Sequence, residues 1–403
     1  MSEQGGVWAD LVGQGATVAV LRAAVASAQP TAAGHGRSDG TGTSRGMTHA
    51  WLFTGPPGSG RSNAARAFAA ALQCPVGGCG TCLACRTALA GSHTDVTLVR
   101  IEQLSIGVDF IRDLVRRAAM HPSAGPWQVI VLEDADRLTE KAADALLKSI
   151  EEPAARTVWL LCAPTVEDVV PTIRSRCRLQ VLRTPPTAAV AEVLMQRDGI
   201  PESVAVSAAR ASQGHIGRAR ALATDEATRS RRHEVLSLPA RLTSLGACMS
   251  AATNLVEAAN REAEPIADDL DAREKADLDQ ALGMGTRGAK VRGAQGAVKE
   301  LEREQKARRK RLQRDALDRA LIDLMSLYRD VLVVQGAGGV DLVNEESRRD
   351  VEQIARSSSA ETTLRRIQAI VDAREALTAN VAPQLAMEAM AVELCPDLSA
   401  AAT

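Results

Sequence analysis

The stretch that decides the fold is Trp51-Leu52-Phe53-Thr54-Gly55-Pro56-Pro57-Gly58-Ser59-Gly60-Arg61-Ser62. It begins as a short apolar run, and a helical pattern follows its glycine-rich centre. Strand, glycine-rich loop and helix in this order are typical of a phosphate-binding loop. The glycines let backbone N–H groups surround phosphates, the helix N-terminus adds partial positive charge, and a hydroxyl can bind Mg²⁺. The predicted nucleotide-binding residues of the loop are Gly55, Pro56, Pro57, Gly58, Ser59, Gly60, Arg61 and Ser62.

Two more apolar runs, 129–132 and 158–162, read as buried strands, with a helix between them that ends before Pro153. Short apolar strands that alternate with helices predict a parallel sheet covered on both faces. Pro185-Pro186 marks a boundary, and the chain beyond it has helical patterns only. We therefore predict an α/β P-loop domain over 1–183, a small helical lid over 184–238 and an all-α domain over 239–403.

Two segments differ from their surroundings. Residues 29–46 are rich in small residues and offer little to bury, so we expect a disordered loop. Residues 260–315 are first acidic and then basic, with a glycine-rich break at 283–296, which predicts a charged helical hairpin with a flexible tip.

Composition limits the class of protein. With 403 residues, 45% hydrophobic and 24% charged, the chain is expected to form two or three globular domains. A net charge of −1 provides no overall field toward nucleic acid or membrane. No stretch approaches the roughly 20 apolar residues that span a bilayer, and residues 1–10 lack the pattern of a signal peptide. We expect a cytoplasmic protein with no membrane partner.

The predicted nucleotide site departs from an active ATPase at two places. Arg61 stands where such loops carry lysine, and its planar, forked head is not equivalent to an ammonium group. Glu133-Asp134 follows the second strand and inverts the usual Asp-Glu order of the metal-holding and water-polarising carboxylates. Because a shift of about 1 Å can cost on the order of a hundredfold in rate, we expect weak ATP/Mg²⁺ binding and poor hydrolysis. A loop retained only for its fold is the alternative.

Four of the eight cysteines lie within twelve residues, spaced C-x4-C-x2-C-x2-C with glycines that allow tight turns between them. In a reducing compartment such a cluster binds metal more often than it forms disulfides. Four thiolates suit a closed, tetrahedral, structural Zn²⁺ site, and an iron–sulfur cluster is the alternative. The predicted zinc ligands are Cys74, Cys79, Cys82 and Cys85.

Four motifs together carry a family resemblance. They are His49–Gly55 leading into the loop, the cysteines placed after its helix, Ala145–Pro153, and Ser175-Arg176-Cys177. With them, residues 7–222 resemble the clamp-loader branch of AAA+ proteins, whose N-terminal adenine-side segment is matched by Val12-Gly13-Gln14.

The resemblance implies a RecA-like AAA+ domain, a three-helix lid and a helical collar that joins a five-membered ring. The ring contains tau or gamma motor subunits and a delta subunit, and it uses ATP to load a sliding clamp onto primer–template DNA during replication. The arginine of Ser-Arg-Cys reaches the ATP of the neighbouring subunit, so Arg176 maps onto an arginine finger that acts in trans, worth about 10³–10⁵ in rate. Ala163 and Gly217 stand where motor subunits carry polar sensor residues, and Arg218 is one residue away.

Three functions follow. The first is a scaffold subunit that lends Arg176 to a neighbour. The second is an active motor ATPase of the tau/gamma type, against which Arg61 and Glu133-Asp134 count. The third is a zinc-dependent nucleic-acid-binding protein, but Arg86 is the only basic residue near the cysteines and no aromatic residue accompanies it. The basic run Arg308–Arg311 is either a contact for DNA or a partner, or a solvated helix face.

Overall fold

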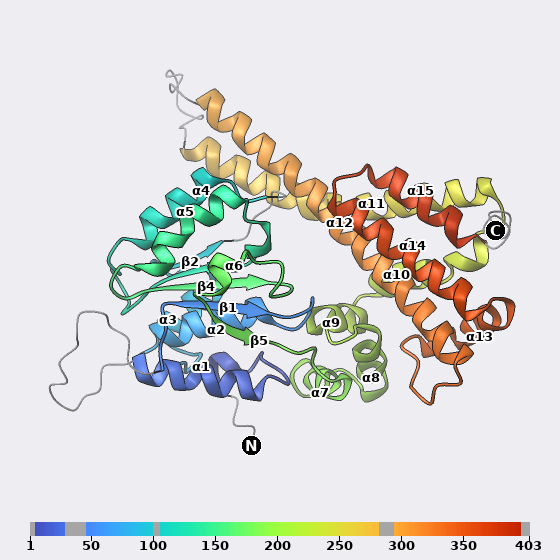
Figure 1. Cartoon of the computed structure of the whole chain (residues 1–403), viewed down its shortest axis with the longest axis horizontal. Helices are drawn as coiled ribbons and strands as arrows, with labels where there is room; N and C mark the ends of the chain where they lie inside the picture. Colours follow the sequence, from blue (N-terminus) through green and yellow to red (C-terminus); the bar gives the residue numbers. More distant parts are fainter. Residues whose placement is uncertain (1–4, 29–45, 100–104, 282–293, 396–403) are drawn as a thin grey trace. The chain divides into compact units, whose positions relative to one another are not determined.

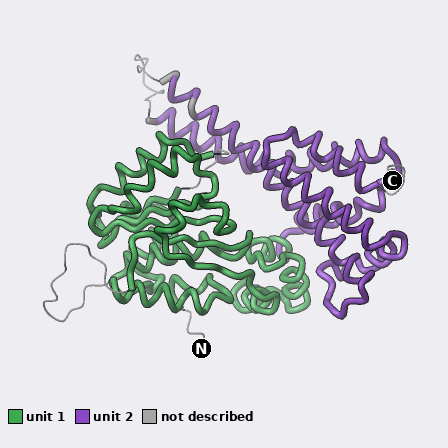
Figure 2. The backbone as a smooth tube through the Cα atoms, viewed as in Figure 1, with its two compact units in different colours: residues 1–223 green, residues 224–403 purple. Residues whose placement is uncertain are grey.

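The structure is a computed structural model, and it describes residues 5–28, 46–99, 105–281 and 294–395 (Figure 1). The chain divides into two compact units, Met1–Ala223 and Thr224–Thr403 (Figure 2). All but residue 46 of the predicted loop at 29–46, and residues 283–293 of the predicted glycine-rich break at 283–296, lie outside the described residues. The last three residues of that break are helical, because a helix begins at Ala294. No helix of the described ranges combines the length and the apolar character needed to cross a bilayer.

The first unit is built on a parallel sheet of five strands in the order β2-β3-β4-β1-β5. Its strands are β1 (Ala50–Thr54), β2 (Val96–Val99), β3 (Gln128–Leu132), β4 (Thr157–Ala163) and β5 (Arg178–Val181). Every residue of β1, β3 and β4 is buried. The predicted parallel α/β sheet is confirmed.

Helices cover both faces of this sheet (Figure 1). They are α1 (Gly15–Ala28), α2 (Arg61–Gln73), α3 (Leu83–Ala90), α4 (Val108–Ala118), α5 (Glu140–Glu151) and α6 (Pro171–Arg174), with short 3-10 turns η1 (Gly6–Trp8) and η2 (Ala135–Arg137). Alternation along β1 separates the two cores: Trp51 and Phe53 belong to one, with Phe68 of α2, and Leu52 belongs to the other, with Leu146 of α5. The three central strands are therefore buried on both faces, whereas the edge strands β2 and β5 are partly exposed.

Three helices complete this unit: α7 (Thr187–Asp198), α8 (Glu202–Ala211) and α9 (Ile216–Thr224). They form a small core of their own around Val190, Leu194 and Ala209. The division into units falls at Ala223/Thr224, and the next helix, α10 (Glu226–Leu236), packs on α12 of the second unit. The boundary between units thus lies earlier than the predicted end of the lid at residue 238.

The second unit is all helical, as predicted. It contains α10, α11 (Leu245–Ala281), α12 (Ala294–Gln335), α13 (Arg348–Ser357), α14 (Ala360–Thr378) and α15 (Pro383–Leu394), with 3-10 turns η3 (Leu238–Arg241) and η4 (Glu345–Ser347). Its core gathers around Leu321, Leu324 and Tyr328 of α12. α11 and α12 lie side by side (Figure 1). The C-terminal half of α11 and the N-terminal half of α12 form the two arms of the predicted charged hairpin.

Candidate nucleotide site and cysteine cluster

The phosphate loop joins the end of β1 to the start of α2. Gly58 and Gly60 have φ angles of 84° and 87°, a region that glycine enters without strain. A Cβ on Gly58 would lie 2.7 Å from Cβ of His215, so the loop is also closely approached from the start of α9. The loop therefore lies between a strand and a helix, and its glycines have the backbone conformations that let N–H groups turn toward a phosphate.

Three of the eight buried side-chain polar atoms that lack a hydrogen-bond partner in the described part of the chain lie at this loop. Within the described residues, Thr54 Oγ1, Ser59 Oγ and Arg61 Nε have no hydrogen-bond partner. Arg61 folds back across the loop, because its Nη1 donates to the Gly55 carbonyl at 2.8 Å. Buried polar groups are normally paired, so these orphaned atoms are consistent with a polar ligand such as a phosphate.

The Glu133 carboxylate, by contrast, is already paired. Arg66 of α2 donates from Nε to Glu133 Oε1 at 3.0 Å and adds a second contact from Nη2. The Glu133 side chain is 9% exposed and that of Arg66 is 20% exposed. Nearby, burial raises the pKa of Asp136, and the charge of Asp134 adds to this effect. The Glu133 carboxylate is thus already engaged by an arginine of the chain itself.

Sequence reasoning missed Arg66. The available signal was a single arginine within the alanine-rich stretch 64–71 of α2. Its role is visible only once the packing of α2 against β3 is known.

Two other segments reach the loop. Gln14 Nε2 donates to the carbonyls of Ser59 at 3.2 Å and Arg183 at 2.6 Å, which ties the N-terminal segment to the loop. At the start of α9, the residue against the loop is His215, whose Nδ1 accepts from the Arg218 backbone N–H at 3.2 Å. The sequence pointed to Gly217 and Arg218 at this helix start, and it gave no signal for His215.

Arg176 lies just beyond α6, and its side chain is 40% exposed. Its Nε forms an ion pair with Glu151, and its Nη1 donates to the Thr172 carbonyl at 2.9 Å and to Ser175 Oγ at 3.2 Å. Two sequence motifs that are separate along the chain, Ala145–Pro153 and Ser175-Arg176-Cys177, therefore meet in space.

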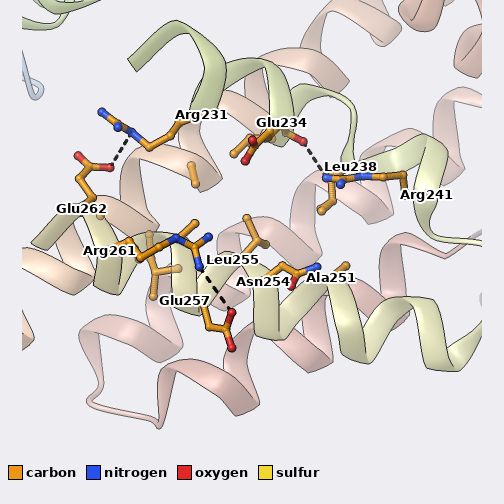
Figure 3. Close-up of a pocket in the computed structure, with 16 residues that line it drawn as sticks. Arg231, Glu234, Leu238, Arg241, Ala251, Asn254, Leu255, Glu257, Arg261 and Glu262 are labelled. Carbon is orange, nitrogen blue, oxygen red and sulfur yellow. Dashed lines mark hydrogen bonds and ion pairs between the residues drawn. The ribbon is translucent and has the colours of Figure 1, made fainter. Parts of the chain in front are cut away.

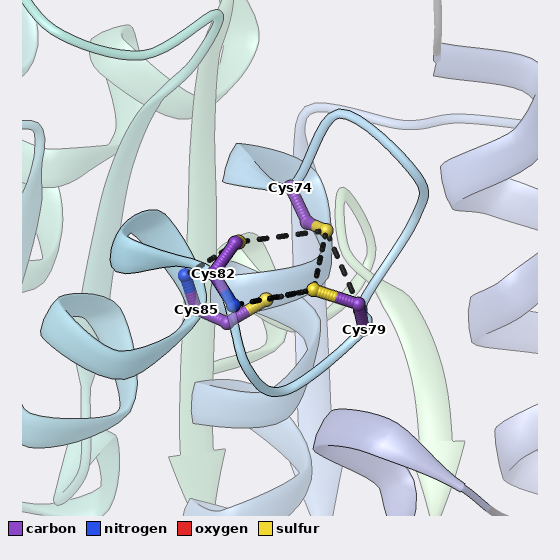
Figure 4. Close-up of side chains that lie close together, drawn as sticks. All are labelled: Cys74, Cys79, Cys82 and Cys85. Carbon is purple, nitrogen blue, oxygen red and sulfur yellow. Dashed lines mark hydrogen bonds between the residues drawn. The ribbon is translucent and has the colours of Figure 1, made fainter.

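The four predicted zinc ligands form a compact cluster (Figure 4). Their Sγ atoms all lie within 4.8 Å of one another, and the Cys74–Cys79, Cys74–Cys82 and Cys79–Cys85 separations are 3.7, 3.9 and 4.0 Å. A tetrahedron with metal–sulfur bonds of about 2.3 Å has edges of about 3.8 Å. The cluster can therefore hold a metal ion, as the spacing predicted.

Backbone N–H groups donate hydrogen bonds to the sulfur atoms of this cluster, which stabilises the thiolate form. The N–H groups of Cys79, Cys82 and Cys85 each donate to a preceding sulfur at 3.4 Å. The Cys82 N–H lowers the pKa of the Cys79 thiol to about 6, with help from Thr81. Burial acts to raise the pKa of Cys74, but backbone N–H groups outweigh it, whereas burial raises the pKa of Cys85. A lowered thiol pKa favours the thiolate, which is the form that binds metal.

The scaffold around the cluster is tightly built. The Val7 N–H donates to the Gly78 carbonyl at 3.1 Å, and a Cβ on Gly78 would lie 2.8 Å from Val7 Cγ2. Gln73, next to Cys74, donates to the Trp127 carbonyl. Asp95 accepts from the backbone N–H groups of Ser123, Ala124 and Gly125 at 2.7, 2.7 and 2.6 Å, which fixes the loop before Trp127.

A cavity of about 310 Å³ lies within the second unit, between α10, α11 and α12 (Figure 3). Four of its charged lining residues form ion pairs, Arg231 with Glu262 and Arg261 with Glu257. Arg241 donates to the backbone carbonyl of Glu234. Apolar side chains such as Leu255 and Leu317 form the rest of the wall. Self-paired charges on an apolar wall are typical of a junction between helices.

Comparison with known proteins addresses the first unit. Residues 42–186 match the family model described as DNA polymerase III, delta subunit. The similarity to that family is confined to this segment. Subunit delta' of DNA polymerase III from Pseudomonas aeruginosa is 40% identical over 152 residues, which are 36% of this chain and 46% of that protein. Subunit delta' from Escherichia coli is 35% identical over 180 residues, which are 43% of this chain and 54% of that protein.

The chain is also similar to DNA polymerase III subunits with other names. Subunit tau of Bacillus subtilis is 37% identical over 137 residues, which are 33% of this chain and 24% of that protein. The chain therefore spans about half the length of the delta' relatives it matches. A solved gamma subunit-related protein from Thermotoga maritima aligns with 86% of this chain and 94% of its own, but at a TM-score of 0.36 and 14% identity that likeness is too distant to support an argument.

Proposed function

We propose that this chain is the delta-prime subunit of a bacterial clamp loader and takes part in ATP-dependent loading of the sliding clamp onto primed DNA. The delta' relatives at 40% and 35% identity support this assignment. The observation that carries it is the pairing of Glu133 with Arg66, beside a well-formed phosphate loop and an exposed Arg176. A subunit with these features would not hydrolyse ATP at its own site. It would contribute to catalysis through Arg176 at the ATP site of a neighbouring subunit.

The arginine-finger role rests on the exposure of Arg176. Its ion pair with Glu151 joins side chains that are 40% and 44% exposed. Exposed pairs contribute about 0–1 kcal/mol, so Arg176 can leave Glu151 at little cost when a neighbouring ATP presents its phosphate. A guanidinium placed on the γ-phosphate stabilises charge in the transition state and is worth about 10³–10⁵ in rate.

The chain's own nucleotide site is proposed to bind ATP weakly and to hydrolyse it poorly. The orphaned atoms Thr54 Oγ1, Ser59 Oγ and Arg61 Nε suit a phosphate, with Arg61 supplying positive charge. Mg²⁺, when bound with ATP, would neutralise phosphate charge. Glu133 is poorly suited to holding it, since Arg66 already engages the carboxylate.

The metal of the cysteine cluster is proposed to be a structural Zn²⁺. Sulfur–sulfur separations of 3.7 to 4.0 Å leave room for a single ion rather than for a multi-iron cluster. All four ligands come from the protein, so no position remains open for catalysis.

The remaining parts are assigned by the same proposal. Residues 184–238 would form the lid and residues 239–403 the collar, which would join tau or gamma and delta subunits in a ring. The sliding clamp and the primer–template DNA would be reached through that complex. A subunit of this machinery would act in the cytoplasm.

The test is a reconstituted loader of motor subunits, delta, clamp and primed DNA, containing this chain as wild type, Arg176→Ala or Arg174→Ala. Arg174 lies in α6 and provides a control with the same change of charge. We expect Arg176→Ala to lower DNA-stimulated ATPase and clamp loading by at least tenfold, with ring assembly intact by gel filtration. Equal rates for the wild type and Arg176→Ala would remove the finger role.

The second candidate is a motor ATPase, favoured by the 37% identity with a tau subunit. It predicts ATP turnover by the chain alone that Arg61→Ala abolishes. The delta-prime proposal predicts no turnover above background in the same assay.

A further inference from the structure

The outer arm of α12 carries a row of basic side chains on one helical face. Lys299, Arg303, Lys306, Lys310 and Arg314 follow the spacing i, i+4, i+7, i+11 and i+15, which keeps residues on a single face of an α-helix. The first four are exposed, and Arg314 is half-buried. We call these five residues the α12 basic stripe.

The neighbouring basic residues are used inside the hairpin. Arg308 is buried and contacts Asp271 and Glu274 of α11, while Arg309 pairs with Asp268 and Asp271. The basic run at 308–311 therefore has two parts, and its arginines at 308 and 309 hold α11 and α12 together.

The lysines of the stripe have no such partner. Among the residues that the structure describes, no carboxylate forms an ion pair with Lys299, Lys306 or Lys310. Like charges three and four residues apart destabilise a helix by a few tenths of a kcal/mol per pair. An external anion bound along the stripe would offset this repulsion between its side chains.

The composition of this face selects the class of anion. A helix that lies on a membrane needs a broad apolar face, but the stripe is bordered by Glu302, Ala307 and Gln313. From Lys299 to Lys310 the helix rises about 16 Å, a length along which duplex DNA presents several phosphates. We propose that the α12 basic stripe binds the phosphate backbone of duplex DNA, without sequence preference.

This contact is local, because the chain as a whole has a net charge of −1. It requires neither Arg176 nor the phosphate loop. It places direct contact with DNA in the second unit, outside the segment 42–186 that the family model matches.

The experiment uses the full chain and two unrelated fluorescent DNA duplexes, with binding measured by anisotropy across a salt series from about 50 to 200 mM. The test variant is Lys299→Gln with Lys306→Gln and Lys310→Gln. The control variant is Lys275→Gln with Arg349→Gln and Arg365→Gln, which removes the same charge from exposed positions of the same unit outside the stripe. Far-UV circular dichroism checks that both variants fold.

We expect wild-type dissociation constants of about 10⁻⁴–10⁻⁶ M, similar for both duplexes. The test variant should bind both more weakly, and its slope of log K against log salt should be smaller by about 2.7, which is 0.9 for each lost phosphate contact. The control variant should keep the wild-type slope.

Two outcomes would overturn the proposal. One is no duplex binding by the wild type at the lowest salt, including the case in which it binds anionic phosphatidylglycerol vesicles instead. The other is an equal slope for the test and control variants. Neither outcome affects the Arg176 experiment, so failure here is distinguishable from failure of the clamp-loader assignment.

Discussion

The two ends of α2 differ in what the chain has kept. At the N-terminal end, the phosphate loop has its backbone shape, but the side chains around it contact the protein itself: Arg61 binds the Gly55 carbonyl and Arg66 binds Glu133. At the C-terminal end, Cys74 begins a set of four thiols with separations that fit a tetrahedral ion. A loop shaped by its backbone can keep its conformation after its catalytic side chains have changed. A metal site made of side-chain ligands is lost when a ligand is lost. This contrast can be tested by substitution.

The largest effect is expected at the cysteine end. Cys82→Ser removes one of four ligands, so bound zinc measured by atomic absorption should fall from about one per chain to near zero. A bound ion at 1,000 times its dissociation constant contributes about 4 kcal/mol to stability, and the variant should lose stability of this order. The melting temperature of the first unit should therefore fall by several degrees.

Cys177→Ser is the matched control, since Cys177 is a half-buried thiol outside the cluster. It should retain full metal content. Wild-type zinc content in Cys82→Ser would show that the four thiols are not the metal site, and the contrast between the two ends of α2 would disappear.

The next effect is expected at the loop end. Arg66→Ala removes the arginine that pairs with the buried Glu133 carboxylate, and breaking such a pair costs about 3–5 kcal/mol when both groups are buried. Because the Arg66 side chain is 20% exposed, we expect about 2–3 kcal/mol, measured by urea unfolding.

The double variant Arg66→Met with Glu133→Gln removes both charges and should recover most of that loss. If Arg66→Ala unfolds at the same urea concentration as the wild type, Arg66 does not neutralise Glu133, and the argument for an inactive metal position loses its support.

How much the sequence could predict follows the same division. Three of the five strands, the loop and the cysteine cluster were predicted because their signals are local: apolar runs, glycine spacing and ligand spacing. The edge strands β2 and β5 were not predicted, because they are only partly buried and lack a continuous apolar run. Arg66 and His215 were not predicted. Arg66 contacts Glu133, which is 67 positions away, and His215 lies against Gly58. Such contacts depend on how the elements pack, which the sequence pattern does not show. The inward pairing of Arg308 was also missed, since it depends on which face of α12 meets α11.

A smaller effect is expected from the scaffold of the cysteine end. Asp95 is 2% exposed, and although burial acts to raise its pKa, the N–H groups of Ser123, Ala124 and Gly125 outweigh it and hold the pKa below its ordinary value. Asp95→Asn should cost about 2 kcal/mol at neutral pH, the range for hydrogen bonds to a charged group.

The pH dependence of this variant has a definite sign. A lowered carboxyl pKa contributes stability that is fully present above the ordinary value of about 3.9 and is lost as the pH falls through the folded value. The difference in unfolding free energy between wild type and Asp95→Asn should be constant from about pH 6 to 8 and narrow below about pH 4. A difference that grows on acidification would contradict this account.

The smallest effect is expected at Arg61, which stands at the lysine position of the loop. Arg61→Lys restores the residue that active phosphate loops carry, and a lysine ammonium can reach a nearby carbonyl as Arg61 reaches Gly55. Affinity for ATP, measured by equilibrium dialysis with labelled nucleotide, should rise by no more than about threefold, because the change alters the shape of the cationic head but not its charge, and the Glu133 carboxylate stays held by Arg66. Phosphate release should stay at background, because Arg66 still holds Glu133 and positioning dominates phosphoryl transfer.

Arg61→Ala is the matched control, and its loss of positive charge should weaken ATP binding. Turnover in Arg61→Lys alone would place the defect in one side chain of the loop rather than in the paired carboxylate of β3, and the N-terminal end of α2 would then be one substitution away from an active site.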